Sequence, residues 1–490
     1  MLDIGLSLIA FIVAIGLLVA VHEYGHFWVA RRLGFKVERF SIGFGRPLAR
    51  WRGRAPDHTE YWLASLPLGG YVKMLDEREG SVPPEDRHRA FNNRPPPHRI
   101  AVLLAGPGFN FLFAIAAYWL LFVTGVPGIK PYIGQVEPGS IADRAGLQAA
   151  DVIESINGQS TETWEHATLA ILDGLLDDAA LQLRVRGEGG AMRDAELDVR
   201  GRISELTAPD ALFSGLGIRP GPALPLPPMV GSVVPGGAAE RAGLEAGDLV
   251  LSIDGMAVAT FEEWAAQIRA RPGETVELRV ERGGRLAATS ARGAEAAAGR
   301  VGPEPTGALL TLRVAIPDTD AAGQPVGQIG VASLSTLPPE LLPPNWAEFI
   351  ESLRAEQRYG LLESVPQSIG KTWEMSALTV RMLGRMVVGD VSMRNISGPI
   401  GIAGYAGDSA QAGLSAFLSF LAIVSISLGI LNLLPVPILD GGQVVYQAAE
   451  WIKGSPVSER VMVLGQQVGI MLLLILMVFV FYNDLARVFS

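Results

Sequence analysis

Residues 5–32 read GLSLIAFIVAIGLLVAVHEYGHFWVARR, a long apolar run that ends with two histidines and then two arginines. No Asp, Glu, Lys, Arg or His occurs between Asp3 and His22. About 20 apolar residues in a helix span the roughly 30 Å hydrocarbon core of a bilayer. The stretch is therefore predicted to cross a membrane. We expect it to be retained, because it lacks a basic start and an Ala-x-Ala cleavage site.

Three further charge-free gaps follow, between Arg99 and Lys130, between Asp408 and Asp440, and between Arg460 and Asp484. The chain of 490 residues is 49% hydrophobic and 18% charged, against about 25% charged in ordinary soluble proteins. Together these features exclude a purely soluble enzyme. The absence of cysteine also excludes disulfides, thiolate metal ligands and cysteine nucleophiles.

The segments between the spans differ in charge. The segment from Arg31 to Arg99 carries 14 Lys and Arg against 8 Asp and Glu, whereas the segment from Gly125 to Asp408 carries 23 against 36. Because cytoplasmic loops of membrane proteins are enriched in Lys and Arg, the first segment is predicted to be cytoplasmic and the second to lie outside. The acidic exterior argues against a nucleic-acid partner. The four apolar runs make the lipid bilayer the expected surrounding.

The long outer segment contains an ungapped repeat with an offset of 97 residues. IGQVEPGS at 133–140 matches VGSVVPGG at 230–237, and DVIESING at 151–158 matches DLVLSIDG at 248–255. Each copy predicts a strand, a short helix, a strand, a tight turn and an amphipathic helix. The pattern resembles the bacterial form of the PDZ domain. That resemblance implies peptide binding through the backbone at Ile133 and Gly134 or at Val230 and Gly231.

The predicted fold class is a polytopic α-helical membrane protein with four transmembrane helices, a small membrane-associated β-sheet and two tandem periplasmic PDZ domains. Its parts are the first span at 1–32, a cytoplasmic loop with a membrane-dipping β-sheet at 33–99, a second span at 100–126, PDZ-like repeats at 127–221 and 222–333, a membrane-proximal helical region at 334–409, a third span at 410–436, a cytoplasmic-side loop at 437–460 and a fourth span at 461–483. Ala287–Gly307 is predicted to be a loose insertion. Glu363–Val388 predicts an amphipathic helix, either on the outer membrane surface or packed on the repeats.

The histidines of the first span form the HExxH pattern His22-Glu23-Tyr24-Gly25-His26. Spacing of i, i+4 places both imidazoles on one face of a helix, which suits chelation of a single metal ion. Glu23 lies between them and can reach a metal-bound water. At 1.5 Å per residue, His26 lies about 7 Å and His22 about 13 Å inward from Arg31. Ionisable side chains at that depth indicate function.

A catalytic zinc takes three protein ligands, so a third must come from elsewhere. The candidate is Asp440, which ends the stretch NLLPVPILD at 432–440 after the third span. Pro435 and Pro437 are expected to break that helix, and Gly441-Gly442 allow a tight turn. Spacing alone leaves open whether Asp440 binds the metal or ends the span as a loop residue in water.

HExxH in the first span, together with Asn-x-x-Pro-x-Pro-x-x-Asp-Gly-Gly in a later one, resembles the site-2 protease family of intramembrane zinc metalloproteases. The resemblance extends over nearly the whole chain and includes Gly43-Phe44-Gly45, PLGGYVKM at 67–74 and GPGFN at 106–110. It implies Zn²⁺ as the cofactor and Asp440 as its third ligand. It also implies that Asn432 assists substrate or oxyanion binding and that the sheet around Gly43-Phe44-Gly45 binds the unwound substrate. We also assign Pro435 and Pro437 to the substrate-binding residues.

The expected reaction is hydrolysis of a peptide bond inside the bilayer. The zinc on His22, His26 and Asp440 acidifies a water, and Glu23 takes its proton and later delivers it to the leaving amine. The resemblance implies single-span membrane substrates, namely an anti-sigma factor trimmed beforehand and, as a second class, remnant signal peptides. It places the chain in a bacterial inner membrane, with the PDZ domains in the periplasm and the active site towards the cytoplasmic side.

Several alternatives remain open at this point. The PDZ pair can act as a size filter that excludes large exterior domains, which we favour, or it can capture a new substrate C-terminus. Asn432 can instead form an interhelical hydrogen bond, and Asn110 is expected to serve helix packing, with Gly106 and Gly108 allowing close contact. The chain as a whole can be a membrane-tethered PDZ scaffold with a vestigial protease centre. A metal transporter fits less well, because four spans show no transport repeat.

Overall fold

The computed structural model describes residues 2–54, 57–222, 226–283, 307–317, 328–333 and 345–489. The chain forms two compact units. The first unit comprises Met1–Pro220 and Ala355–Ser490, and the second comprises Gly221–Arg354. Each unit is described by itself below.

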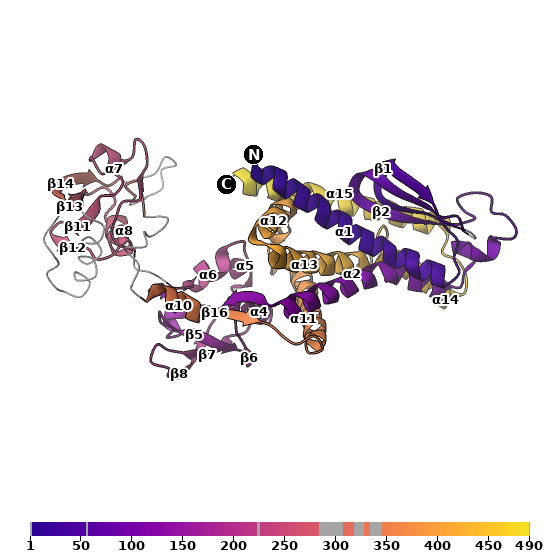
Figure 1. Ribbon diagram of the computed structural model, residues 1–490, viewed down its shortest axis with the longest axis horizontal. Coiled ribbons are helices and arrows are strands. Elements are labelled where there is room, and N and C mark those ends of the chain that lie inside the picture. The colour runs from indigo at the N-terminus through magenta and orange to yellow at the C-terminus, as the bar shows by residue number, and fades with distance from the viewer. Residues whose placement is uncertain are drawn as a thin grey trace. The chain divides into compact units, whose positions relative to one another are not determined.

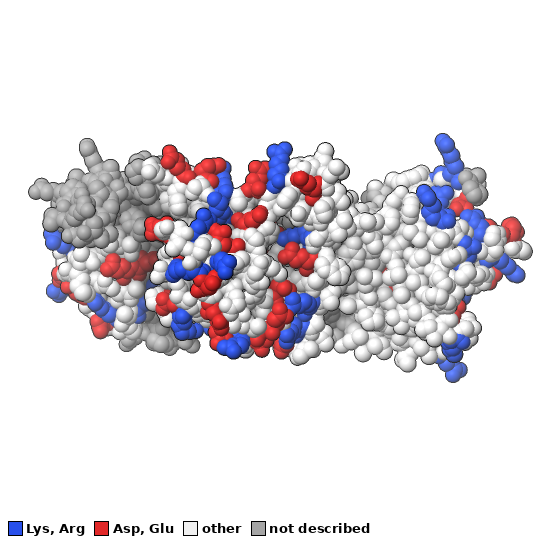
Figure 2. Space-filling model, turned by 90° about the horizontal axis from the view of Figure 1, so that it is seen from below, with Lys and Arg blue, Asp and Glu red and all other residues white. Residues whose placement is uncertain are grey.

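Four helices of the first unit are long and apolar enough to cross a membrane. They are α1 (Leu2–Arg32), α2 (Pro96–Thr124), α13 (Leu414–Leu433) and α15 (Glu459–Phe489). The helix α2 packs against both α1 and α13, and α1 begins where α15 ends, at the same end of the bundle (Figure 1). Figure 2 shows a broad surface without charged side chains where these helices lie. Leucines of these helices are half exposed, such as Leu8 of α1 at 55% and Leu472 of α15 at 50%, as expected for side chains that face lipid.

A β-sheet lies beside α1 and is built from only two long strands, β1 (Val37–Arg52) and β2 (Glu60–Met74). Both strands bend, so each contributes two segments. The register gives the segment order 70–74, 37–44, 60–66 and 46–52 across the sheet. The segments 70–74 and 46–52 are therefore the two edges, and no other described strand pairs with either of them. Two short turns of 3-10 helix, η1 (Arg87–Arg89) and η2 (Phe91–Asn93), connect the sheet to α2.

The region 437–460 was predicted to be a loop, and this prediction was wrong. It contains the helix α14 (Asp440–Lys453), which packs along α2. An acidic residue in the first turn, a lysine in the last turn and Gly454 in the left-handed conformation after it are ordinary signals of a helix. Pro435 and Pro437 precede this helix and end the span before it, and the two features together were mistaken for one irregular loop.

The two repeats have the element order that the sequence predicts. The first contains β4 (Ile133–Val136), α3 (Ile141–Arg144), β5 (Val152–Ile156), β6 (Gln159–Ser160), α4 (Trp164–Leu175), β7 (Leu181–Arg186), β8 (Met192–Leu197), α5 (Ile203–Leu206), α6 (Ala211–Leu216) and β9 (Ile218–Pro220). The second contains β10 (Ser232–Val233), α7 (Ala238–Arg241), β11 (Leu249–Ile253), β12 (Met256–Ala257), α8 (Phe261–Arg269), β13 (Thr275–Arg282), β14 (Ala308–Ala315) and β15 (Val331–Ala332). Asn157 and Asp254 both have positive φ before a glycine, as a tight two-residue hairpin turn requires. The insertion proposed at Ala287–Gly307 lies outside the described residues except for Gly307.

The first repeat is joined to the bundle by the segment that follows the second repeat. The helix α10 (Trp346–Leu353) leads into β16 (Arg354–Gln357), which pairs with β3 (Val126–Ile129). The helix α11 (Ser364–Val388) contacts both α2 and α4, and Arg381 of α11 forms ion pairs with Asp173 and Asp177. After it come the short η4 (Met393–Asn395) and α12 (Pro399–Ala412), which packs on α1 and α13. α11 thus occupies nearly the range predicted for the helix at Glu363–Val388.

Candidate metal centre

The first two spans approach each other closely at the level of the histidines. Gly25 of α1 faces the carbonyl of Ala105, and a Cβ at Gly106 of α2 would overlap the imidazoles of His26 and His22. Only glycine leaves room for the two rings between these helices. Gly108, by contrast, faces open space, so the expectation of close contact was correct for Gly106 and wrong for Gly108.

Both imidazoles are oriented by α2. The Nδ1 of His26 lies 2.8 Å from the carbonyl oxygen of Val102, to which it donates. The Nδ1 of His22 lies 3.3 Å from the amide nitrogen of Asn110, a fully buried residue. The Oδ1 of Asn110 has no partner among the described residues, so turning the amide over lets it accept a hydrogen bond from His22 Nδ1. Both Nε2 atoms are then free to bind a metal.

Asn110 was predicted to serve helix packing, and the sequence analysis missed its contact with His22. The residue also contacts α13, because its carbonyl oxygen accepts a hydrogen bond from Ser425 at 2.9 Å. One residue therefore orients a ligand and joins two spans. The sequence did contain a signal for this contact. Asn110 lies one turn after Gly106 on a span that was expected to pack against the HExxH helix.

Asp440 reaches the histidines from the opposite end of the sequence. It is the first residue of α14, and the turn before it is tight because Gly441 and Gly442 lie against the carbonyls of Leu433 and Val436. Any side chain at these glycines would push the turn apart. The turn therefore directs the Asp440 carboxylate towards α1.

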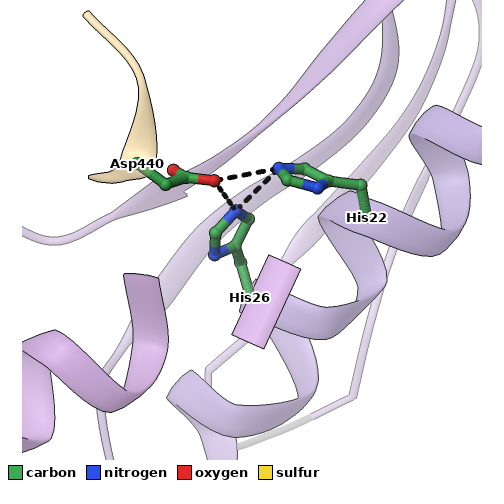
Figure 3. A group of neighbouring side chains, drawn as sticks. All are labelled: His22, His26 and Asp440. Carbon is green, nitrogen blue, oxygen red and sulfur yellow. Dashed lines mark hydrogen bonds and ion pairs between the residues drawn. The ribbon is translucent and has the colours of Figure 1, made fainter. Parts of the chain in front are cut away.

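The three side chains meet in a compact triangle (Figure 3). The Nε2 atoms of His22 and His26 are 3.2 Å apart, and Oδ2 of Asp440 lies 3.1 Å from the first and 3.3 Å from the second. A tetrahedral zinc with bonds of about 2.0–2.1 Å holds its ligand atoms about 3.3 Å apart. The spacing of the three atoms therefore fits zinc, with the fourth position left for water or substrate.

The donor set itself favours a bound cation. The Oδ2 of Asp440 is buried and has no hydrogen-bond donor among the described residues. Three Lewis bases converge on one point, and a cation relieves their mutual repulsion. Two imidazoles and one carboxylate are a ligand set typical of catalytic zinc. Within the described part of the chain, the ligand atoms of His22, His26 and Asp440 all lie within 4.8 Å of one another, close enough to hold one metal ion.

The other residues predicted for the site lie around this triangle. Glu23 follows His22 on α1, and its side chain borders Gly70 on the sheet edge 70–74. Gly43 belongs to the interior segment 37–44, and the ring of Phe44 stacks on Tyr71 with centroids 6.2 Å apart. Asn432 lies in the last turn of α13, and its partly buried side chain forms no hydrogen bond within the described part of the chain.

The two prolines occupy different surroundings. Pro437 packs near Gly465 and Gly469 of α15, whereas Pro435 is exposed. No contact in the structure tests a role of either proline in substrate binding. Pro437 instead joins the turn before Asp440 to the fourth span.

The residues proposed for peptide binding in the repeats are paired internally. The amide of Ile133 donates to the carbonyl of Asp151, and the amide of Val230 donates to Asp248. Both side chains are fully buried, and the amide of Gly231 donates to Ala332. The open groove of the second repeat lies elsewhere, between α8 and the segment 328–332, with a volume of about 360 Å³. A peptide-binding role of Ile133, Gly134, Val230 and Gly231 stays a prediction.

A helix that carries HExxH, completed by a distant carboxylate inside a bundle of membrane-length helices, defines a membrane-embedded zinc metalloprotease. Comparison with known families agrees with this class. The model of Peptidase family M50 matches residues 10–476, and the chain belongs to this family. The family predicted from the sequence motifs is thus confirmed, as are the enzyme class and zinc as the cofactor.

Curated relatives match the chain over its full length. The chain is 42% identical to the protein named Protease RseP of Yersinia pestis, with 99% of this chain and 100% of the relative covered. It is 39% identical to the regulator of sigma-E protease RseP of Escherichia coli, with 98% of each covered. A putative zinc metalloprotease of Vibrio cholerae is 39% identical, with 99% and 100% covered. Among solved structures, a PDZ domain from Listeria monocytogenes matches 23% of this chain and 90% of its own at 21% identity, with a TM-score of 0.16.

Proposed function

We propose that this protein hydrolyses a peptide bond within the transmembrane segment of single-span membrane proteins. The expected substrate is an anti-sigma factor already trimmed by another protease, with remnant signal peptides as a second class. The name of the relative from Escherichia coli supports a place in sigma-E regulation. We further propose a bacterial inner-membrane location, with both repeats in the periplasm.

The observation that carries this proposal is the ligand triangle at the end of a membrane-length helix. Its edges of 3.1–3.3 Å match a tetrahedral zinc, and two of its corners lie on α1 before Arg31 and Arg32. Zinc bound there lowers the pKa of a water in the open position and polarises a peptide carbonyl. A hydrolytic centre at this depth acts on peptide bonds that membrane helices otherwise bury.

The chain's own residues supply the proton transfers. Glu23 follows a ligand on the same helix, where its carboxylate can accept a proton from the attacking water and pass it to the leaving amine. Asn432, on the last turn of α13, is proposed to donate a hydrogen bond to the developing oxyanion. The contacts from Val102 and Asn110 keep both imidazoles in the tautomer that this chemistry needs.

The sheet offers a way to present the substrate. A helical substrate hides its peptide bonds, so the segment must unwind and extend before it is cleaved. The edge 70–74 borders Glu23 and pairs on one side only, so an extended substrate can add to it as a further strand. In this arrangement Gly43 and Gly45, both with φ of 89°, form the bend of β1, and Phe44 braces Tyr71 on the edge segment.

The repeats are proposed to select substrates by the size of their exterior part. The first repeat is fixed to the bundle through α11, whereas the second forms a unit of its own. Peptide capture is a secondary role that the open groove of the second repeat supports. The walls of that groove are mostly apolar, including Phe261, Ile268 and Val331.

The test is cleavage of a tagged single-span anti-sigma segment by the purified protein in detergent or liposomes. Cleavage should require zinc, stop on addition of a chelator and return when zinc is restored. The Glu23→Gln variant should bind zinc and leave the segment intact. Cleavage that continues in metal-free protein would overturn the proposal.

A second candidate function is a tethered PDZ scaffold with a vestigial protease centre. The open groove of the second repeat is the observation in its favour. The complete set of His22, Glu23, His26 and Asp440 argues against it, since a centre without selection tends to lose ligands. Retained signalling in cells by the Glu23→Gln variant would favour the scaffold.

A further inference from the structure

The helix α2 holds the two sides of the metal centre by different means. Through Val102, Gly106 and Asn110 it fixes the histidines, as described above. It also contacts α14, the helix that begins with Asp440. The spacing of 3.1–3.3 Å between the ligand atoms therefore depends on how α14 is seated against α2.

One strong polar contact joins these two helices away from the ligands. Arg99, in the first turn of α2, donates from Nη1 to Oε2 of Glu450 at 3.0 Å and from Nη2 to Oε1 at 2.5 Å. Arg99 is 4% exposed, and the Glu450 side chain is 19% exposed. A two-pronged contact between a guanidinium and a carboxylate fixes distance and orientation, which a lysine ammonium cannot do.

This contact lies far from the metal ligands along both helices, so it constrains the orientation of α14 relative to α2. Glu450 lies ten residues beyond Asp440 on α14, about 15 Å along the helix axis, and Arg99 lies seven residues before Gly106 on α2. The Arg99–Glu450 contact thus fixes the two helices to each other at the end far from the ligands. Rotation or sliding of α14 would carry the Asp440 carboxylate away from the imidazoles.

We propose that Arg99 and Glu450 are positioning residues that hold α14 in the register at which Asp440 completes the zinc site. This inference rests on the metal centre proposed above and deepens it. The competing explanation is that the pair merely neutralises two buried charges. In that case its loss lowers the stability of the fold and leaves the zinc affinity of the folded protein unchanged.

The experiment measures the rate at which zinc leaves the purified full-length protein, using a chromogenic chelator in excess. We expect Arg99→Lys and Glu450→Gln to release zinc at least tenfold faster than the wild type and to lower kcat more than they raise KM. Controls are Arg89→Lys and Asp57→Asn, because Arg89 and Asp57 form a comparable pair at 2.5 Å that touches neither α2 nor α14. These controls should change the release rate by less than twofold.

A second arm uses the absence of cysteine from the chain. In the double variant Arg99→Cys with Glu450→Cys, a short cross-linker that joins the two thiols through disulfide bonds should restore slow zinc release. Reduction of these disulfides should make zinc release fast again. Wild-type release rates in Arg99→Lys and Glu450→Gln, or a completed cross-link without restoration, overturn the inference. A wild-type protein that holds no zinc overturns the proposed metal centre instead.

Discussion

The metal centre and the two repeats differ in how far apart in the sequence their working residues lie. His22 and Asp440 come from opposite ends of the chain and meet only because glycines at 25, 106, 441 and 442 let backbones approach closely. Each repeat folds from one continuous stretch around its own core. The centre therefore depends on the packing of the whole bundle, whereas each repeat depends mainly on itself.

The repeats also differ from each other although their sequences match. In the first, Phe213 of α6 packs against Trp164 with ring centroids 5.3 Å apart, on the side of α4 that corresponds to the open groove of the second. In the second, Phe261 occupies the position equivalent to Trp164 and lines an open groove.

Because the metal centre does the chemistry and the repeats do not, substitutions at the centre should abolish cleavage of every substrate. Substitutions in the repeats should instead alter the choice among substrates.

The largest effect is expected from Glu23→Gln. The amide cannot take a proton from water, so cleavage should fall by about 10²–10⁴-fold, the usual contribution of a general base. Zinc content should stay at the wild-type level, because Glu23 is no ligand. The measurement pairs reporter cleavage with metal analysis, and His22→Ala serves as the control that loses zinc. Cleavage close to the wild-type rate would show that the base lies elsewhere.

A smaller effect is expected from Asn110→Leu. Loss of the partner that orients a ligating imidazole typically weakens metal binding by about 10–100-fold. The matched control is Ser425→Ala, which removes a hydrogen bond to the backbone of Asn110 and leaves its contact with His22 intact. Competition with a zinc indicator measures both. Equal zinc affinities of the two variants would contradict a role of Asn110 in orienting His22.

The repeats should show effects that depend on the ligand. Ala265 lines the groove of the second repeat, so Ala265→Arg is expected to weaken the binding of a labelled peptide with an apolar C-terminus about tenfold. Ala266→Arg, on the exposed side of the same helix, is the matched control. Fluorescence anisotropy measures both. If Ala265→Arg binds as well as its control, the groove is not the peptide site.

The smallest effect concerns pH at the junction of the first repeat with α11. Burial disfavours the imidazolium of His166 and the nearby Lys371 repels it, so the pKa of His166 lies below its ordinary value of 6.5. The unfolded state then binds the proton more readily, and stability should decline as the pH falls through 6.5. His166→Asn should reduce this decline in melting curves. An identical decline in wild type and variant would contradict the role of His166.

The sequence predicted the chemistry of the metal centre better than it predicted which residues bring the ligands together and orient them. The spacing of HExxH was enough to predict a metal site on His22 and His26. Asp440 required the resemblance to a family, because nothing local distinguishes a ligand from an aspartate that ends a span. The contact of Asn110 with His22 was missed, since a buried amide in a span looks the same in sequence whether it joins helices or orients a ligand.

The fold was predictable where patterns are local. Four charge-free runs gave the four long helices, and the 97-residue offset gave two repeats with the same element order. The helix α14 was missed because Pro435 and Pro437 suggested a loop that continued beyond them. The contact of Phe213 with Trp164 also escaped prediction, because it depends on packing between α6 and α4 that the repeat pattern does not contain.

The most direct test of the central claim is X-ray absorption at the zinc edge of the purified protein. We predict one zinc per chain, bound by two imidazole nitrogens and by oxygen ligands, all at about 2.0–2.2 Å. His26→Ala, like His22→Ala, should purify without zinc. A zinc surrounded only by oxygen, or a full zinc content with unchanged imidazole scattering in His26→Ala, would contradict this coordination.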